Sequence, residues 1–298
     1  MSWRGQLAIL PYRVGETAAQ VMPPRVGLAI ANVGGALAAR FAAGRRQMVV
    51  RHQRRVRGPA ADADGAVAAT FESYARYWYE MLRITTDARR NEIARNFSEE
   101  GWQHVDDALA QGKGVIFACP HLGGWEYAAA WVAQEKGHRM LAVVESLQPP
   151  ELYEWFVKQR SAIGLDITPL GPGVSTAVLG ALRENRIVCL LSDRDLTGDG
   201  VEVEFFGETT TLPAGPATLA LRSGAVILPV TAYFTADRGH HAVIRAPLTV
   251  AREGRLREDI ARITQQLARE FETLIREAPE QWHLLQPNWP SDRMAVEG

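Results

Sequence analysis

The chain has 298 residues, enough for one large α/β domain or two small ones. Hydrophobic residues make up 47% of it and charged residues 22%, the balance of a soluble globular protein with a sizeable core. The two cysteines, Cys119 and Cys189, each lie in an apolar run, and they are too few for a disulfide framework.

The formal net charge of −1 conceals an uneven distribution along the chain. Residues 1–57 contain ten arginines, no lysine and one acid, Glu16, for a formal charge of +9, whereas the remainder carries −10. Such a segment is typical of an arm that meets a polyanion, either a nucleic acid or an anionic membrane. The alternative interpretation is a solvated helix face.

The neighbouring sequence favours a membrane. Residues 26–39 are apolar except for Asn32, but a spanning helix needs about 20 such residues. We therefore expect an interfacial or re-entrant anchor, with the arginines of residues 45–57 beside anionic headgroups. Pro11 and Glu16 interrupt the region where a signal peptide would have its apolar core, so we place the bulk of the protein on the cytoplasmic side.

Beyond this segment the pattern becomes regular. Phe71, Tyr74, Trp78 and Met81 recur at spacings of three and four, which predicts an amphipathic helix after a loop at residues 60–69. The predicted strands are residues 114–119, 140–144, 165–170, 187–191, 201–205 and 226–232, with an edge strand at 242–245. The predicted helices are residues 125–135, 150–163, 175–184 (capped by Ser175), 213–223 and 256–276. This alternation predicts one α/β domain with a mostly parallel sheet flanked by helices.

A histidine and a carboxylate follow the first predicted strand at a spacing of five. His121 and Glu126 enclose Gly123 and Gly124, directly after the apolar run that ends at Pro120. A neutral imidazole can take a proton from a hydroxyl, and a carboxylate can hold its tautomer and stabilise the imidazolium. The glycines allow a tight turn and could bring amide N–H groups to an oxyanion. The pattern predicts an acyl-transfer site.

Further charged residues gather at the carboxyl end of the strand at residues 187–191. Asp193 is a second candidate to orient the imidazole, and Arg194 follows it. Glu145 ends another predicted strand, and Arg160 lies on a predicted helix. In parallel sheets ligand sites lie at these strand ends, although an Asp–Arg structural pair would explain the same residues. A nucleophilic pair of Cys119 with the imidazole is disfavoured because Cys119 lies inside a buried run. The histidines show no metal spacing, so we predict no metal site.

With these residues in place, the chain resembles the bacterial acyltransferases that act on sugars of lipid anchors. The His121–Glu126 motif matches that of glycerolipid-type acyltransferases. Within them, the chain looks closest to the phosphatidylinositol mannoside acyltransferases, with the lipid A late acyltransferases as the alternative. The matching stretches are residues 73–78, 152–160, 193–197, 200–201, 205–208, 213–216 and 278–289.

The resemblance implies a membrane-associated enzyme that moves a fatty acyl group from acyl-CoA, or acyl carrier protein, to a sugar hydroxyl of a glycolipid. It implies a single acyltransferase domain at residues 70–292, an arginine-rich membrane-associated segment at residues 1–69, and no resident cofactor. Its location would be the cytoplasmic face of an anionic bacterial inner membrane. The sequence gives no indication of the oligomeric state.

Roles carried over by position make His121 the general base and Asp193 or Glu126 its partner. Arg160 and Glu145 would line the acceptor pocket, with Arg194 beside them. The mannoside enzymes typically have glutamate at the position of Asp193 and aspartate at that of Glu126. This exchange leaves open which carboxylate contacts the imidazole.

Three other functions compete with this interpretation. A hydrolase could use the same histidine–acid pair to activate water on a lipid thioester. A nucleic-acid-binding protein could use the arginine arm, but that arm lacks base-stacking aromatic residues, so we expect no nucleic acid partner. A catalytically inert lipid carrier would bind acyl lipid without turnover.

Overall fold

The computed structural model describes residues 3–60 and 62–297. Helices come first along the chain: α1 (Trp3–Val21), α2 (Pro24–Phe41), α3 (Ala43–Arg57), α4 (Ala63–Arg89) and α5 (Glu92–Arg95). The strands are β1 (Phe97–Glu100), β2 (Val115–Cys119), β3 (Met140–Val144), β4 (Leu165–Pro169), β5 (Ile187–Leu191), β6 (Val201–Phe205), β7 (Glu208–Leu212), β8 (Val226–Phe234) and β9 (His240–Ile244). The later helices are α6 (Trp102–Leu109), α7 (Trp125–Glu135), α8 (Pro150–Ser161), α9 (Val174–Arg183), α10 (Gly215–Ser223), α11 (Leu256–Glu277) and α12 (Pro290–Glu297).

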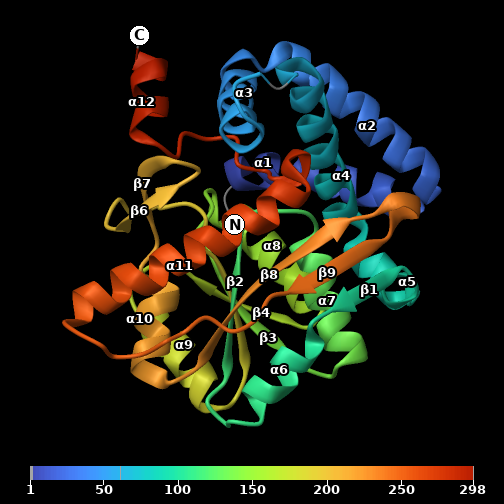
Figure 1. The fold of residues 1–298 in the computed structure, drawn as a ribbon. Coiled ribbons are helices and arrows are strands. Elements are labelled where there is room, and N and C mark those ends of the chain that lie inside the picture. The colour runs from blue at the N-terminus through green and yellow to red at the C-terminus, as the bar shows by residue number, and fades with distance from the viewer. Residues whose placement is uncertain (1–2, 61, 298) are drawn as a thin grey trace.

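Seven strands form the central sheet in the order β1-β9-β8-β2-β5-β3-β4, and β6 with β7 forms a separate hairpin. Each neighbouring pair of the central sheet is parallel except β8 with β9. Helices cover both faces, as Figure 1 shows. The predicted α/β fold with a mostly parallel sheet is confirmed.

The alternation of side chains along the central strands produces two cores. In β2, Ile116 joins the cluster beneath α9, α10 and α11, whereas Phe117 joins the cluster beneath α6, α7 and α8. Successive side chains of a strand point to opposite faces, so a strand buried on both faces is apolar throughout. The fully buried pattern of β2 explains why its carboxyl end can fix the position of a polar residue that follows.

The edge of the sheet differs from the prediction. We expected an edge strand at residues 242–245, but β9 lies between β8 and β1, and β1 forms the edge. The acids Glu99 and Glu100 concealed β1, because charged residues are typical of solvated segments and also of exposed edge strands. The hairpin partner β7 was also missed, since three successive threonines show no apolar alternation.

Two helix starts differ from the prediction as well. The expected loop at residues 60–69 is mostly helix, because the carboxylate of Asp62 accepts the amides of Asp64 and Gly65 and starts α4. The expected cap Ser175 lies inside α9, which follows Gly173 in a left-handed conformation with φ of 87°. The boundary expected between residues 69 and 70 falls inside α4.

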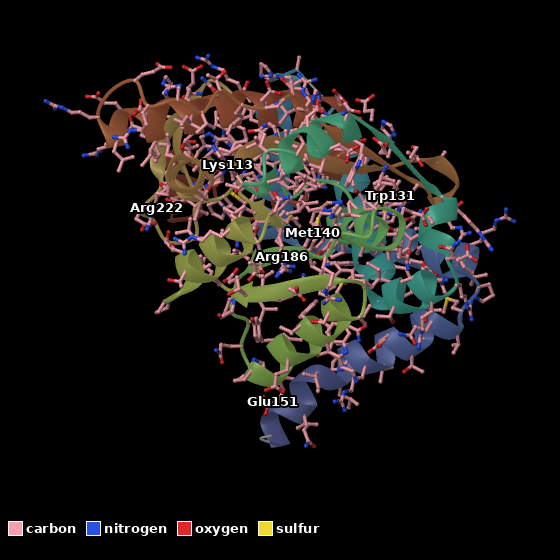
Figure 2. All side chains as sticks on the ribbon, turned by 90° about the horizontal axis from the view of Figure 1, so that it is seen from below. Lys113, Trp131, Met140, Glu151, Arg186 and Arg222 are labelled. Carbon is pink, nitrogen blue, oxygen red and sulfur yellow. The ribbon has the colours of Figure 1, made fainter. Side chains whose placement is uncertain are left out.

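The N-terminal helices place large apolar side chains on the surface. α2 packs closely on α4, where a side chain at Gly27 would overlap the ring of Tyr79. Figure 2 shows the blue N-terminal helices along one side of the molecule, near Glu151 of α8, and α11 on the opposite side. The large apolar residues that α1 and α2 leave exposed are Leu7, Leu10, Val14, Val21, Val26, Ile30, Val33, Leu37 and Phe41.

No single helix in the described part of the chain is both long and apolar enough to span a membrane. By length and composition, α2 and α3 meet that criterion as a pair, with a bend of 97° between them.

The arginines of α3 bear on one expectation. We expected residues 45–57 to face anionic headgroups, and several of these arginines form ion pairs with acids of the same chain. The pairs are Arg46 with Asp64, Arg51 and Arg55 with Asp292, and Arg57 with Glu280. Arg45 and Arg54 remain exposed. Part of the charge of this helix is therefore balanced by acids of the C-terminal segment and α4, and the contact of α3 with headgroups stays a prediction.

Candidate active site

The carboxyl ends of β2 and β5 bring a histidine and an aspartate together. Cys119 and Leu191 are paired in the register of the two strands, and His121 and Asp193 each follow two residues later. The imidazole Nδ1 of His121 lies 2.6 Å from Oδ1 of Asp193, and the backbone N–H of His121 donates to Oδ2 at 3.0 Å. Asp193 is fully buried, whereas a third of the His121 side chain is exposed. In this His121–Asp193 dyad, the aspartate is enclosed and part of the imidazole is accessible from outside.

The charge of Asp193 determines the tautomer of His121. Burial by itself would raise the pKa of Asp193, but attraction to His121 and hydrogen bonds from His121 and Trp282 lower it below its usual value. An ionised carboxylate can accept hydrogen bonds but cannot donate them. The proton therefore lies on Nδ1 of His121, and its Nε2 carries a free lone pair, as a general base requires.

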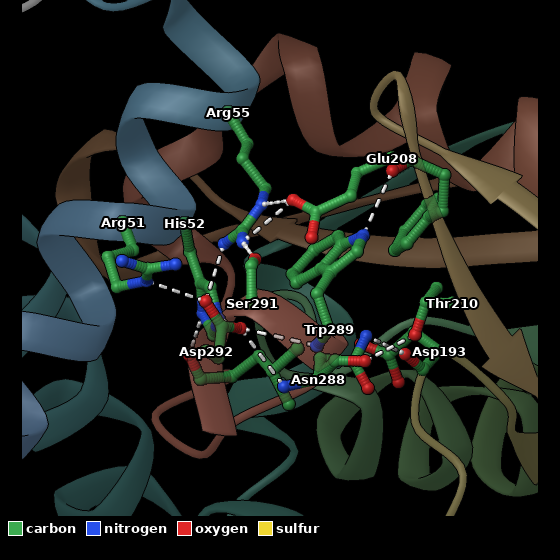
Figure 3. A network of polar contacts seen from close by, with 12 residues as sticks. Arg51, His52, Arg55, Asp193, Glu208, Thr210, Asn288, Trp289, Ser291 and Asp292 are labelled. Carbon is green, nitrogen blue, oxygen red and sulfur yellow. Dashed lines mark hydrogen bonds and ion pairs between the residues drawn. The ribbon is translucent and has the colours of Figure 1, made fainter. Parts of the chain in front are cut away.

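The C-terminal segment holds the aspartate in place. The indole Nε1–H of Trp282 donates to Oδ2 of Asp193 at 2.8 Å, and the amide of Asn288 donates to the Asp193 carbonyl at 3.1 Å. Figure 3 shows Asn288 beside Asp193 and next to Asp292, which accepts from Arg51 and His52 of α3. Sequence reasoning missed these positioning contacts, because the segment lies about ninety residues from Asp193 and has no local pattern that signals them.

Glu126 does not contact the imidazole. Its Oε1 accepts from the hydroxyl of Tyr77 at 2.8 Å and from Arg160 at 3.0 Å, and the side chain is 2% exposed. Its Oε2 is buried without a hydrogen-bond partner among the described residues. Asp193 is therefore the carboxylate that contacts His121, and Glu126 pairs with Arg160. Burial, followed by the charge of Glu126, raises the pKa of Tyr77 well above its usual value, so this phenol remains protonated.

The other predicted charges form a second pair at the same site. Arg194 donates to Glu145 at 3.2 Å, with the carboxylate 56% exposed and the guanidinium largely buried. Both residues line the cavity that contains His121. The predicted substrate-binding residues Arg160, Glu145 and Arg194 are therefore brought together around the dyad.

The two glycines of the motif serve the turn and do not offer free amides. The N–H of Gly123 donates to Gln281 O at 3.0 Å, and that of Gly124 donates to Ala232 O at 2.8 Å. Gly123 has φ of 67°, and a side chain there would overlap the Ala232 carbonyl. Oxyanion donors were expected near these glycines, at the start of the next helix; the glycines' own N–H groups are not free for that role, because both are already hydrogen-bonded. Of the first four amides of α7, those of Tyr127 and Ala128 donate to the Gly124 carbonyl, so only those of Trp125 and Glu126 have no partner within the helix.

Two cavities meet at the dyad. The first has a volume of about 420 Å³ and extends along an apolar wall that includes Val143, Val178, Leu190 and Leu219. The second has a volume of about 220 Å³ and is lined by aromatic rings and His283. The residues that line both are Tyr77, His121, Trp125, Leu147, Arg160 and Arg194. His121 therefore lies where an apolar chain and a polar group can approach from different cavities.

His283 is a member of the site that the motif analysis did not identify. Its Nε2 lies 2.8 Å from the hydroxyl of Ser73, and its ring packs against Tyr74 and Tyr77. Burial, followed by the nearby His121, lowers the pKa of His283 from 6.5 to about 3. The ring is therefore neutral near pH 7 and does not add a second positive charge beside His121.

The cysteines play no part in this geometry. The sulfur of Cys119 lies 3.8 Å from that of Cys189, and both are buried between strands. The hydrogen bond with Cys189, with burial, raises the pKa of Cys119, so this group remains a thiol. A search of the described residues finds no group of three or more His, Cys, Asp or Glu side chains placed to hold a metal.

Comparison with known proteins agrees with the resemblance deduced from the motifs. The chain is 41% identical over 239 residues to a phosphatidylinositol mannoside acyltransferase of Mycobacterium tuberculosis, covering 78% of this chain and 73% of that protein. A phosphatidylinositol mannoside acyltransferase of Mycolicibacterium smegmatis is 36% identical over 293 residues, covering 97% and 93% of the two chains. A lipid A biosynthesis acyltransferase of Haemophilus influenzae is 25% identical over 185 residues, 61% of this chain and 55% of that protein.

A family model described as bacterial lipid A biosynthesis acyltransferase matches residues 12–291, which include both cavities' lining residues and the His121–Asp193 dyad. The chain therefore belongs to the bacterial lipid A biosynthesis acyltransferase family and is an acyltransferase.

Proposed function

We propose that this acyltransferase moves a fatty acyl chain from acyl-CoA to a mannose hydroxyl of a phosphatidylinositol mannoside. The observation that carries the proposal is the meeting of an apolar and an aromatic cavity at the His121–Asp193 dyad. The apolar cavity suits the acyl chain of the donor, and aromatic rings with charged pairs suit a sugar. Relatives named phosphatidylinositol mannoside acyltransferase support mannose as the acceptor.

The reaction is a direct transfer with His121 as general base. Its Nε2 accepts the proton of the mannose hydroxyl while the hydroxyl oxygen attacks the thioester carbonyl carbon. The carbon–sulfur bond then breaks, and the same Nε2–H protonates the thiolate, which leaves as free CoA. Asp193 stabilises the imidazolium that exists between these two steps. We assign the oxyanion to the first amides of α7, since Trp125 lines both cavities and the Gly123 and Gly124 amides are occupied.

Glu126 and Arg160 position the acceptor rather than the proton. Their ion pair is buried next to His121, where Arg160 also lies over the rings of Trp125 and Phe156. A pair fixed on one side by aromatic rings can direct its remaining hydrogen-bonding capacity at sugar hydroxyls. Arg194 and Glu145 are more exposed and suit the phosphate-rich part of the donor or the rim of the sugar site.

The membrane association is also a proposal. We infer that α1 and α2 lie on the cytoplasmic face of an anionic inner membrane. Their exposed large apolar side chains would enter the interface, and the exposed Arg25 and Arg40 lie at the ends of α2.

The test is product analysis with purified protein and radiolabelled palmitoyl-CoA. A phosphatidylinositol mannoside, a lipid A precursor and water are offered as acceptors, and palmitoyl carrier protein is compared as donor. Labelled mannoside formed by the wild type and absent with His121→Ala would support the proposal. Labelled lipid A precursor in its place would move the acceptor to the other branch, and free palmitate with every acceptor would indicate a hydrolase.

A further inference from the structure

A third cavity lies outside the dyad, between the N-terminal helices and α4. Its volume is about 500 Å³. Small residues of α1 and α2 form one wall, and aromatic residues of α4 form the other. Its lining includes Gly34, Ala38, Arg45, Tyr74, Trp78 and Leu285. Apart from Arg45 at its border, the groove presents almost entirely apolar atoms, so its natural occupant is a hydrocarbon.

This groove adjoins the aromatic cavity of the active site. Tyr74 and Trp78 line both spaces. The C-terminal segment also separates them, because Leu285 lines the groove while its neighbours Leu284 and Gln286 line the aromatic cavity. A molecule could therefore place a polar group at His121 and a hydrocarbon chain in the groove by passing these residues.

The groove is continuous with the exposed apolar surface of α1 and α2. Ile30 lines it and is 56% exposed, and Val33 on the next turn is 61% exposed. Arg45 is exposed at the border, where a phosphate would meet a positive charge. An amphiphile with a phosphate between its sugar and its hydrocarbon matches this order of polar and apolar surfaces.

We propose that the groove of α1, α2 and α4 binds a fatty acyl chain of the acceptor glycolipid, while the acceptor's sugar lies at His121. The inference rests on the proposed function, since it assigns a lipid-anchored acceptor to the aromatic cavity. The proposed function places the donor chain in the apolar cavity, which His121 also lines. The two hydrocarbon sites are then separate cavities, so donor and acceptor can be held at the same base at once, as a direct transfer requires.

Gly34 offers a way to fill the groove without disturbing the protein. A side chain at Gly34 meets nothing within 4 Å, and the same is true of Gly44 in α3, which does not line the groove. Gly34→Trp should therefore occupy the groove, and Gly44→Trp is the matched control. Both replace glycine in a helix by a residue of higher helix propensity, so both should fold.

The first experiment compares two acceptors in solution, away from any membrane. One is a dihexanoyl phosphatidylinositol mannoside below its critical micelle concentration, and the other is its deacylated headgroup. We expect the wild type and Gly44→Trp to prefer the acylated acceptor in kcat/KM, and Gly34→Trp to lose that preference by about tenfold or more. An unchanged preference in Gly34→Trp would overturn the proposal.

The second experiment does not require turnover and so separates this proposal from the proposed function. Phosphatidylinositol with a photoreactive diazirine at the end of one chain is cross-linked to the full chain, and the sites are mapped. Cross-links at Ala38 and Trp78 that Gly34→Trp abolishes are expected. Cross-links confined to outward residues such as Val33, or between two copies of the chain, would mean that the groove faces bulk lipid or another protomer, and would overturn it.

Discussion

The carboxyl ends of β2 and β5 and the helices α1–α3 distribute polar and apolar groups in opposite ways. At the sheet, apolar side chains are buried, and the buried carboxylates Asp193 and Glu126 lie close to the partly exposed His121, which lines both cavities. In α1 and α2, large apolar side chains face outward, while α3 directs arginines inward to Asp292. The first arrangement places polar groups beside the cavities at His121. The second leaves an apolar surface on α1 and α2 and joins α3 to the C-terminal segment through ion pairs.

The difference shows that the net charge of a segment does not predict where its charged side chains lie in the folded protein. The segment of residues 1–57 carries +9, yet part of this charge neutralises acids from elsewhere in the same chain. The position of His121 in the fold was easier to predict than that of the arginines, because the end of a strand fixes where the next residue can lie.

Replacing Asp193 tests the dyad at the carboxyl ends of β2 and β5. Asp193→Asn should lower kcat by about 10³-fold, because a neutral amide does not hold the imidazole tautomer or stabilise the imidazolium. Steady-state kinetics with palmitoyl-CoA and a mannoside acceptor measure this. Glu126→Gln is the control, and it should raise the acceptor KM while lowering kcat far less, since Glu126 contacts Arg160 and not His121. Equal losses of kcat in the two variants would contradict the assignment.

Replacing Asp292 tests the inward use of charge by α3. Asp292 is fully buried, accepts hydrogen bonds from Arg51 and His52 and forms an ion pair with Arg55, so Asp292→Ala should lower the free energy of unfolding by about 3 kcal/mol. Denaturant unfolding measures the change. Asp64→Ala is the control on an exposed pair with Arg46 and should cost under about 1 kcal/mol. A similar cost for both would show that the buried network does not stabilise the fold.

Trp282 contacts both regions, because it donates to Asp193 at the sheet and packs against His52 of α3. Trp282→Phe removes the N–H that donates to Asp193 and should lower kcat about tenfold. Loss of that donor also raises the pKa of Asp193, so the acid limb of the pH–rate profile should move to higher pH. Trp289→Phe is the matched control, because its indole donates to the Phe205 carbonyl. A structural role alone would leave the acid limb of both variants unchanged.

His283 gives the smallest effect, a dependence of stability on pH. Its pKa is about 3 in the folded protein against 6.5 in the unfolded chain. Between these values the unfolded chain binds a proton that the folded protein does not, so stability is complete above pH 6.5 and falls as the pH decreases toward 3. His283→Gln should make this decline shallower in denaturant unfolding at several pH values. An unchanged slope would mean that His283 is not held neutral by burial.

The sequence predicted the parts of the site that follow directly from strand ends. His121 and Asp193 were both expected there, and their contact arises from the register that pairs Cys119 with Leu191. The sequence did not show which carboxylate would reach the imidazole, because that depends on the direction in which α7 leaves the loop.

Contacts between distant segments could not be predicted. Asp292 meets α3 across about 240 residues, and Trp282 meets Asp193 across 89. No spacing pattern reports such contacts, which depend on how the completed layers pack. The edge strand β1 was missed for a different reason, since half of its four residues are acids.

The central claim is that His121 is the base between two substrates that bind independently of it. The most direct measurement is kcat for His121→Ala with palmitoyl-CoA and a phosphatidylinositol mannoside, alongside the Kd of each ligand. The account predicts a fall in kcat of about 10⁴-fold with both Kd values nearly unchanged. Turnover close to that of the wild type would contradict it.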